Sequence, residues 1–84
     1  MVGIAHPTNG TLHLKTLEAW YGAPPDRDEP VVQLFLANNG PQIGEVREHN
    51  DGLILELFRM TSSLVIPLEE LQEVLRIAQN RLTS

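Results

Sequence analysis

The stretch SLVIPLEELQEVLRIAQNRL (residues 63–82) decides the fold, because it joins a short apolar run to the one strongly helical segment of the chain. We expect residues 63–66 to form a strand and Pro67 to precede a helix, since the first amide protons of a helix have no intrahelical acceptor. Acidic residues near the start and basic residues toward the end favour both helix ends. Apolar residues at three- and four-residue spacing form one stripe, made of Leu68, Leu71, Leu75, Ala78 and Leu82.

The residues before this stretch alternate between strand-like runs and turns. We expect strands at Thr11–Tyr21, Val31–Ala37, Gln42–Asn50 and Leu53–Met60. In the first of these, the apolar positions change parity midway, which indicates a bulge near Lys15. The alternative is that the second half of this run belongs to a different local structure.

The sequence Asp51-Gly52 predicts the tightest turn, because both central residues of a type I′ hairpin need positive φ. With these two residues at the centre, Arg47 opposes Glu56 on one face of the hairpin. Leu55 and Leu57 share the other face, which we expect to pack under the helix. Together with Leu71 and Leu75 of the helical stripe, they should be among the most buried residues.

These elements predict one α+β domain over residues 1–84, with residues 1–10 as a flexible lead-in. Its architecture is an antiparallel β-meander of four to five strands with one C-terminal α-helix packed on one face. Topology alone does not identify a function.

Composition limits the classes of protein that the chain can represent. The 84 residues carry a formal net charge of −5 and include no cysteine, so neither disulfides nor thiolate–metal sites supplement the core. No apolar run approaches the roughly 18 residues of a membrane-spanning helix. The N-terminus also lacks a charged start followed by an apolar run, so we expect no secretory signal, no membrane association and a cytoplasmic location.

The titratable residues form no pattern typical of catalysis or metal binding. His6, His13 and His49 are separated by 7 and 36 residues, which matches no ligand motif. Paired carboxylates lie in an expected exposed loop or at the helix start, whereas acid–base catalysis needs two carboxyl groups in different environments. No glycine-flanked serine and no phosphate-binding glycine loop is present. We therefore expect no enzymatic activity, no metal and no cofactor.

Aromatic and acidic residues gather around the segment Gly22–Pro30, whose prolines and charges predict a loop. Aromatic side chains beside a polar loop are a common kind of contact site. We expect a partner contact formed by Trp20, Tyr21, Asp26, Asp28 and Glu29. The alternative is that one aromatic ring packs in the core while the other caps the sheet edge.

Apolar residues cover more of the helix and sheet than one layer contact can bury. Val74 and Ile77 form a second helical stripe, and Phe35, Ile54 and Phe58 lie on the sheet face away from the helix. We expect a homodimer through one of these two faces. The alternative is that Val74 and Ile77 border the core.

The order of strands followed by a helix, over about Thr11–Leu82, resembles the PC4, Whirly and Pur modules that bind single-stranded nucleic acids. That resemblance rests on element order alone and implies a nucleic-acid-associated module. The residues that we would then expect to make its contacts are Trp20, Tyr21, Lys15 and Arg47. Only six basic residues are scattered along the chain, however, and phosphate binding needs a basic footprint. We therefore expect a non-catalytic protein-interaction module, such as an acidic inhibitor, immunity-type or adaptor protein. The nucleic-acid module is the alternative.

Overall fold

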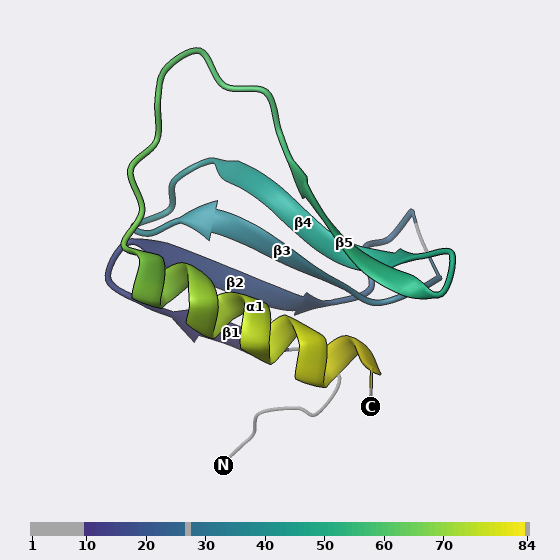
Figure 1. The fold of residues 1–84 in the computed structure, drawn as a ribbon. Helices are drawn as coiled ribbons and strands as arrows, with labels where there is room; N and C mark the ends of the chain where they lie inside the picture. Colours follow the sequence, from purple (N-terminus) through teal and green to yellow (C-terminus); the bar gives the residue numbers. More distant parts are fainter. Residues whose placement is uncertain (1–9, 27, 84) are drawn as a thin grey trace.

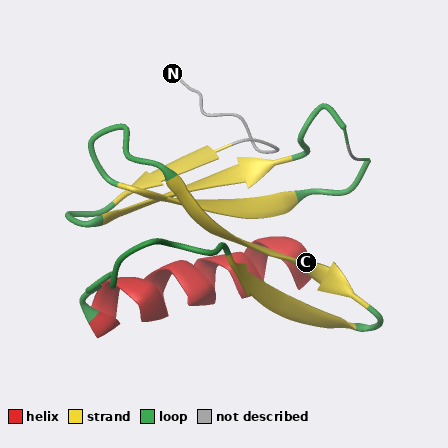
Figure 2. Ribbon diagram, turned by 90° about the horizontal axis from the view of Figure 1, so that it is seen from above, coloured by secondary structure: helices red, strands yellow, loops and turns green. Residues whose placement is uncertain are grey.

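In the residues that the structure describes, the chain forms one five-stranded antiparallel sheet and one helix (Figures 1 and 2). The computed structural model describes residues 10–26 and 28–83. Neighbouring strands of the chain are neighbours in the sheet, and the helix covers one sheet face, so the predicted α+β meander is confirmed. The elements are β1 (Gly10–His13), β2 (Leu17–Gly22), β3 (Val31–Leu36), β4 (Gln42–His49), β5 (Gly52–Leu57) and α1 (Leu68–Thr83).

The expected long first strand is wrong, because the chain reverses within it. β1 and β2 pair with each other as an antiparallel hairpin. The amide of Leu14 donates to the carbonyl of Leu17 at 2.9 Å and closes the turn between them. The change of apolar parity near Lys15 therefore marks a turn and not a bulge. Gly10 already belongs to β1, while residues 1–9 of the expected lead-in lie outside the described residues.

β4 and β5 form the expected hairpin, but its turn lies one residue earlier than the sequence predicted. Asn50 and Asp51 have φ values of 48° and 69°, so they occupy the two central positions, and Gly52 already belongs to β5. As a result, the register between β4 and β5 differs by two residues from the expected one, and Val46 opposes Leu55 instead of Leu57. Because this difference is an even number, each side chain keeps its expected face.

A glycine in β4 favours the observed register. Gly44 opposes Leu57, and a Cβ atom at position 44 would lie only 2.6 Å from the carbonyl oxygen of Glu56. This close approach of the two backbones needs a residue without a side chain. In the register expected from Asp51-Gly52, Gly44 would instead oppose Arg59.

The expected strand at Ser63–Ile66 is also wrong. This segment belongs to an irregular connection, residues 58–67, which arches away from the sheet before α1 begins (Figure 1). Leu64 and Ile66 are half-buried, whereas Val65 is 87% exposed, so the alternation of a strand is present. Within the described chain β4 is the only strand that pairs with β5, so residues 63–66 do not extend the sheet.

The N-terminal end of α1 is fixed to the sheet by one carboxylate. Glu70 Oε1 accepts hydrogen bonds from the backbone amides of Thr16, at 2.8 Å, and Leu17, at 3.0 Å. Near the other end of α1, the Arg81 guanidinium lies 5.3 Å from the centre of the Tyr21 ring. The helix therefore runs in the same direction as β2 and contacts both β2 and β4.

This path explains why part of the predicted core is wrong. Leu55 is 38% and Leu57 66% exposed, while Leu71 and Leu75 are half-buried. Because α1 contacts β2 and β4, it lies over β3, the strand between them. A helix with its side chains reaches only about 5–6 Å from its axis. β5 lies two strands beyond β3, about 10 Å away, and is therefore outside that reach. The buried cluster lies instead between α1 and β2–β4, and contains Leu17, Ala19, Val32, Leu34, Ile43, Val46, Val74, Ala78 and Leu82.

The location of this core can be tested by comparing two truncations. Leu34 is fully buried, so Leu34→Ala should lower the free energy of unfolding by about 2–5 kcal/mol. Val65→Ala removes methyl groups from an exposed side chain and should change it by less than about 0.5 kcal/mol. Urea unfolding measures both values. Similar losses for the two variants would contradict this core.

The anchoring of α1 can be tested with two adjacent glutamates. Glu70→Ala removes the acceptor of two backbone amides, so we expect a loss of about 1.5–3 kcal/mol in unfolding free energy. Glu69→Ala is the matched control, because Glu69 is exposed in the same helical turn and gives only the interaction with the helix dipole, about 0.3–1 kcal/mol. Equal losses in urea unfolding would show that the two amide contacts contribute nothing.

Candidate functional site

Exposed carboxylates gather at one end of the sheet. In a meander, the loop after β2 and the turn after β4 lie at the same end, which is also where α1 finishes (Figure 1). The carboxylates of this loop, of the last part of β4 and of the turn are exposed there, and no hydrogen bond or ion pair joins them to a residue in the described part of the chain. We call this surface the acidic end; it consists of Asp26, Asp28, Glu29, Glu48 and Asp51.

The expected partner contact is divided by the structure. Asp26, Asp28 and Glu29 lie in the acidic end, but Trp20 and Tyr21 are adjacent in β2 and point to opposite faces of the sheet. Tyr21 is half-buried against the core on the helix side, beneath Arg81. Sequence reasoning could find the acidic loop, but it missed Glu48 and Asp51, whose signal is the charge at the tip of the predicted hairpin.

Trp20 instead lines a hollow on the sheet face that α1 does not cover. The hollow has a volume of about 490 Å³. It extends from Trp20 in β2 toward the turn between β3 and β4, away from the acidic end. Glu18 lines the hollow and accepts a 3.1 Å contact from the His13 ring. The lining residues are Thr11, Glu18, Ala19, Trp20, Gln33, Phe35, Asn39 and Gly40.

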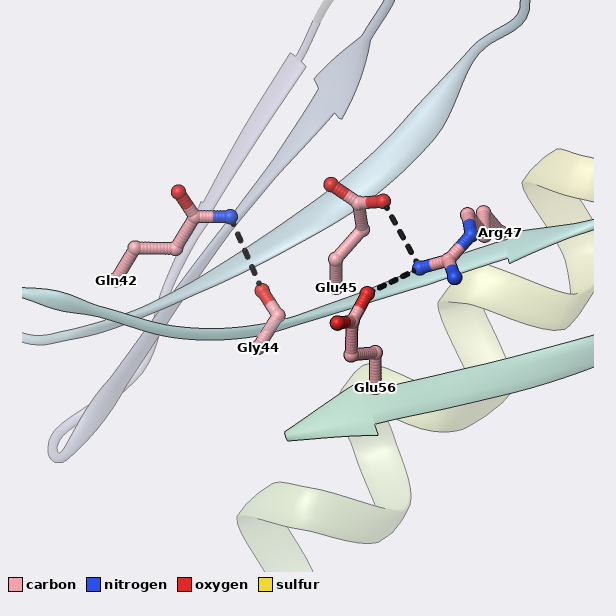
Figure 3. Close-up of polar contacts among 5 residues, drawn as sticks. All are labelled: Gln42, Gly44, Glu45, Arg47 and Glu56. Carbon is pink, nitrogen blue, oxygen red and sulfur yellow. Dashed lines mark hydrogen bonds and ion pairs between the residues drawn. The ribbon is translucent and has the colours of Figure 1, made fainter. Parts of the chain in front are cut away.

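An arginine on the same sheet face lies between two carboxylates (Figure 3). Arg47 Nη1 donates to Glu56 Oε1 at 2.6 Å and to Glu45 Oε2 at 3.3 Å. The predicted Arg47–Glu56 contact is therefore present, although the two residues are diagonal and not opposite. Glu45 is only 2% exposed, so this guanidinium also compensates a buried charge.

The residues proposed for a dimer interface do not form one surface. Val74 is fully buried between α1 and the sheet, which corrects its assignment to an exposed stripe, and Ile77 beside it is half-buried. Phe35 lines the hollow, and Ile54 is half-buried on the same sheet face. Phe58, expected on that face, lies beyond the end of β5 and turns toward the helix side.

An apolar surface that sequence reasoning missed surrounds β5. Residues 58–67 enclose a cavity of about 260 Å³ against the sheet and α1, lined by Leu34, Ile43, Leu55, Leu57, Phe58, Met60, Leu64, Ile66 and Leu71. Leu57, which lines this cavity, remains 66% exposed. The leucine row of β5 was visible in the sequence, but its place at the sheet edge, beyond the reach of the helix, was not.

The remaining charged contacts are local. On the exposed face of α1, a hydrogen bond from Arg76 lowers the pKa of Glu73, and the same contact raises the pKa of Arg76. Within residues 10–26 and 28–83, no group of three or more histidine, aspartate or glutamate side chains is placed to hold a metal ion. The helix of this described part is too short and too polar to span a membrane.

Comparison with known proteins adds no relative: no family model, no curated protein and no solved structure matches the chain.

Proposed function

We propose that this protein is a non-catalytic interaction module of the cytoplasm, which binds a positively charged protein partner through its acidic end. The observation that supports this function is the meeting of two acidic connections at one end of the sheet, where five exposed carboxylates have no partner among the described residues. An inhibitor, immunity-type protein or adaptor that masks a basic surface has these features.

Most of the other carboxylates have partners, which distinguishes the acidic end from them. Glu45 and Glu56 contact Arg47, Glu73 contacts Arg76, and Glu70 binds two backbone amides. These groups stabilise the fold through their contacts. The carboxylates of the acidic end form no ion pair with a described residue, so they do not stabilise the fold in this way. An excess of one sign of charge attracts an oppositely charged partner and raises its rate of association.

The two connections at the acidic end also differ in a useful way. The β4–β5 turn is tight, with Asn50 and Asp51 as its centre, so it holds its charges in fixed positions. The β2–β3 connection is longer and its carboxylates are exposed, so it can adjust to the outline of a partner. A turn with fixed charges beside a loop that can adjust its shape suits recognition of a protein surface.

The nucleic-acid alternative has less support. Arg47 is held by two carboxylates and Arg76 by Glu73. Arg81 lies over an aromatic ring at the acidic end, and Lys15 and Arg59 lie near the opposite end of the sheet. Lys15 and Arg59 follow the two opposite edge strands, β1 and β5, so the described cations form no continuous basic footprint for a phosphate backbone.

The function can be tested by neutralising two charges at either of two places. The double variant Asp28→Asn/Glu29→Gln changes the acidic end, and Glu69→Gln/Glu73→Gln is a control with the same net charge on α1. Partner protein retained from an extract of the source cells provides the ligand, and its dissociation constant is measured at several salt concentrations. We expect the first variant to bind about tenfold more weakly, a change of about 1.4 kcal/mol, and the control to bind as the wild type does.

Binding that weakens equally in both variants would reflect net charge alone and would contradict the assignment of the acidic end. Binding that persists unchanged at 1 M salt would contradict an electrostatic contact, because surface charges are screened over about 3 Å at that concentration.

A further inference from the structure

The outer edge of β5 offers backbone groups that no strand in the described chain uses. The Phe58 amide donates to the Ile43 carbonyl at 2.9 Å, which continues the β4–β5 ladder beyond the end of β5. Because hydrogen-bonded positions alternate along an antiparallel strand, the even-numbered residues of β5 face β4. Leu53, Leu55 and Leu57 therefore direct their amides and carbonyls away from the sheet.

The same three residues also present apolar side chains. They lie on the helix side of the sheet, but α1 does not reach them, so Leu55 and Leu57 are 38% and 66% exposed. Sheet edges are usually protected by lysine, proline or a bulge. β5 contains none of these, and the only charge within it, Glu56, is turned to the other face and paired with Arg47.

We propose that this edge pairs with β5 of a second copy of the same chain, antiparallel and about a two-fold axis at Leu55. Each Leu55 then opposes Leu55 of the second copy, and each Leu53 opposes Leu57. Such a contact is isologous, so one strand needs to complement only itself. The two sheets join into one of ten strands, and both helices lie on the same side of it.

The charges on β5 select this register from the neighbouring ones. In the proposed register, Glu56 opposes Ile54 of the second copy. A shift of two residues in one direction would place Glu56 opposite Glu56, where like charges repel. A shift of two residues in the other direction would place Leu57 opposite Asp51, so Leu57 would no longer face a leucine of the second copy. The proposed register is the one that keeps all three leucines together.

The two ends of the strand are also complementary in charge. Arg59 follows β5 and Asp51 precedes it, and neither has an ion-pair partner among the residues that the structure describes. Antiparallel pairing centred on Leu55 places Arg59 of each copy opposite Asp51 of the other. Opposite charges that face each other across strands stabilise their pairing. A second copy therefore fits this edge in shape, polarity and charge.

This contact uses one residue of the acidic end, Asp51. It uses the edge of the sheet, and the two-fold axis directs the acidic ends of the two copies to opposite ends of the assembly. Asp26, Asp28 and Glu29 stay outside the contact. Because the binding test changes Asp28 and Glu29, and the dimer test changes residues of β5, a failure of one proposal is distinguishable from a failure of the other.

The absence of native cysteine allows the register to be tested directly. Residues opposed in a hydrogen-bonded pair have Cα atoms about 5.5 Å apart, which a disulfide can span. Leu55→Cys should therefore crosslink to itself under mild oxidation. Leu53→Cys alone should not, because two copies of residue 53 would lie four residues out of register, about 13 Å apart. An equal mixture of Leu53→Cys and Leu57→Cys should crosslink.

Sedimentation equilibrium of the unmodified chain supplies a second measurement. We expect a mass near twice 9.4 kDa at tens of micromolar. Leu57→Lys should restore the monomer mass, and because Leu57 is exposed in the single chain, the variant should keep its circular dichroism spectrum. Gln72→Lys, on the exposed face of α1, is the control and should remain a dimer.

A monomer at millimolar concentration would overturn the proposal. Self-crosslinking of Leu53→Cys as readily as Leu55→Cys would overturn the register and with it the two-fold contact. A dimer that survives Leu57→Lys would place the interface elsewhere and would equally overturn it.

Discussion

The arrangement of this protein depends on the two hydrogen bonds that Glu70 accepts from the amides of Thr16 and Leu17. They join the first turn of α1 to the turn between β1 and β2, more than fifty residues earlier in the chain. The Ala37 amide donates to the Thr16 carbonyl at 2.8 Å, so the turn between β3 and β4 meets the same corner. With one end of α1 fixed there, the helix lies along β2. The strands that it covers, and the strand that it leaves bare, follow from that path.

The sequence predicted the elements that depend on local chemistry. The apolar period of residues 68–82 indicated α1, and alternation with turn residues indicated the sheet and its meander order. The hairpin turn was harder, because Asn50-Asp51 and Asp51-Gly52 both tolerate positive φ. The backbone approach at Gly44, which favours the first of these, is a contact between strands and leaves no local signal. The β1–β2 hairpin was missed for a similar reason, since Lys15 and Thr16 are not residues that identify a tight turn.

The candidate surfaces were less accessible than the fold to sequence reasoning. The acidic loop before Pro30 was found from composition alone, but its joining with Glu48 and Asp51 required the topology. Trp20 and Tyr21 were grouped because they are adjacent, although adjacency in a strand places side chains on opposite faces. The exposure of Leu57 required the position of α1 relative to β5, which no pattern within either element reveals. The dual role of Glu70 was hidden for the same reason, because the helix dipole already accounted for an acidic residue at that position.

The meander also has a consequence for how the chain folds. Each strand pairs with its neighbour in sequence, so the sheet can assemble through short loop closures, whereas docking α1 against β2 closes a loop of roughly fifty residues. The entropy of closing a loop grows with the logarithm of its length, and for this one the length-dependent part is about 3.5 kcal/mol. Proteins rich in contacts between nearby residues fold fast. The contacts within the sheet therefore close short loops, whereas the contacts between α1 and β2 carry the largest entropy of loop closure.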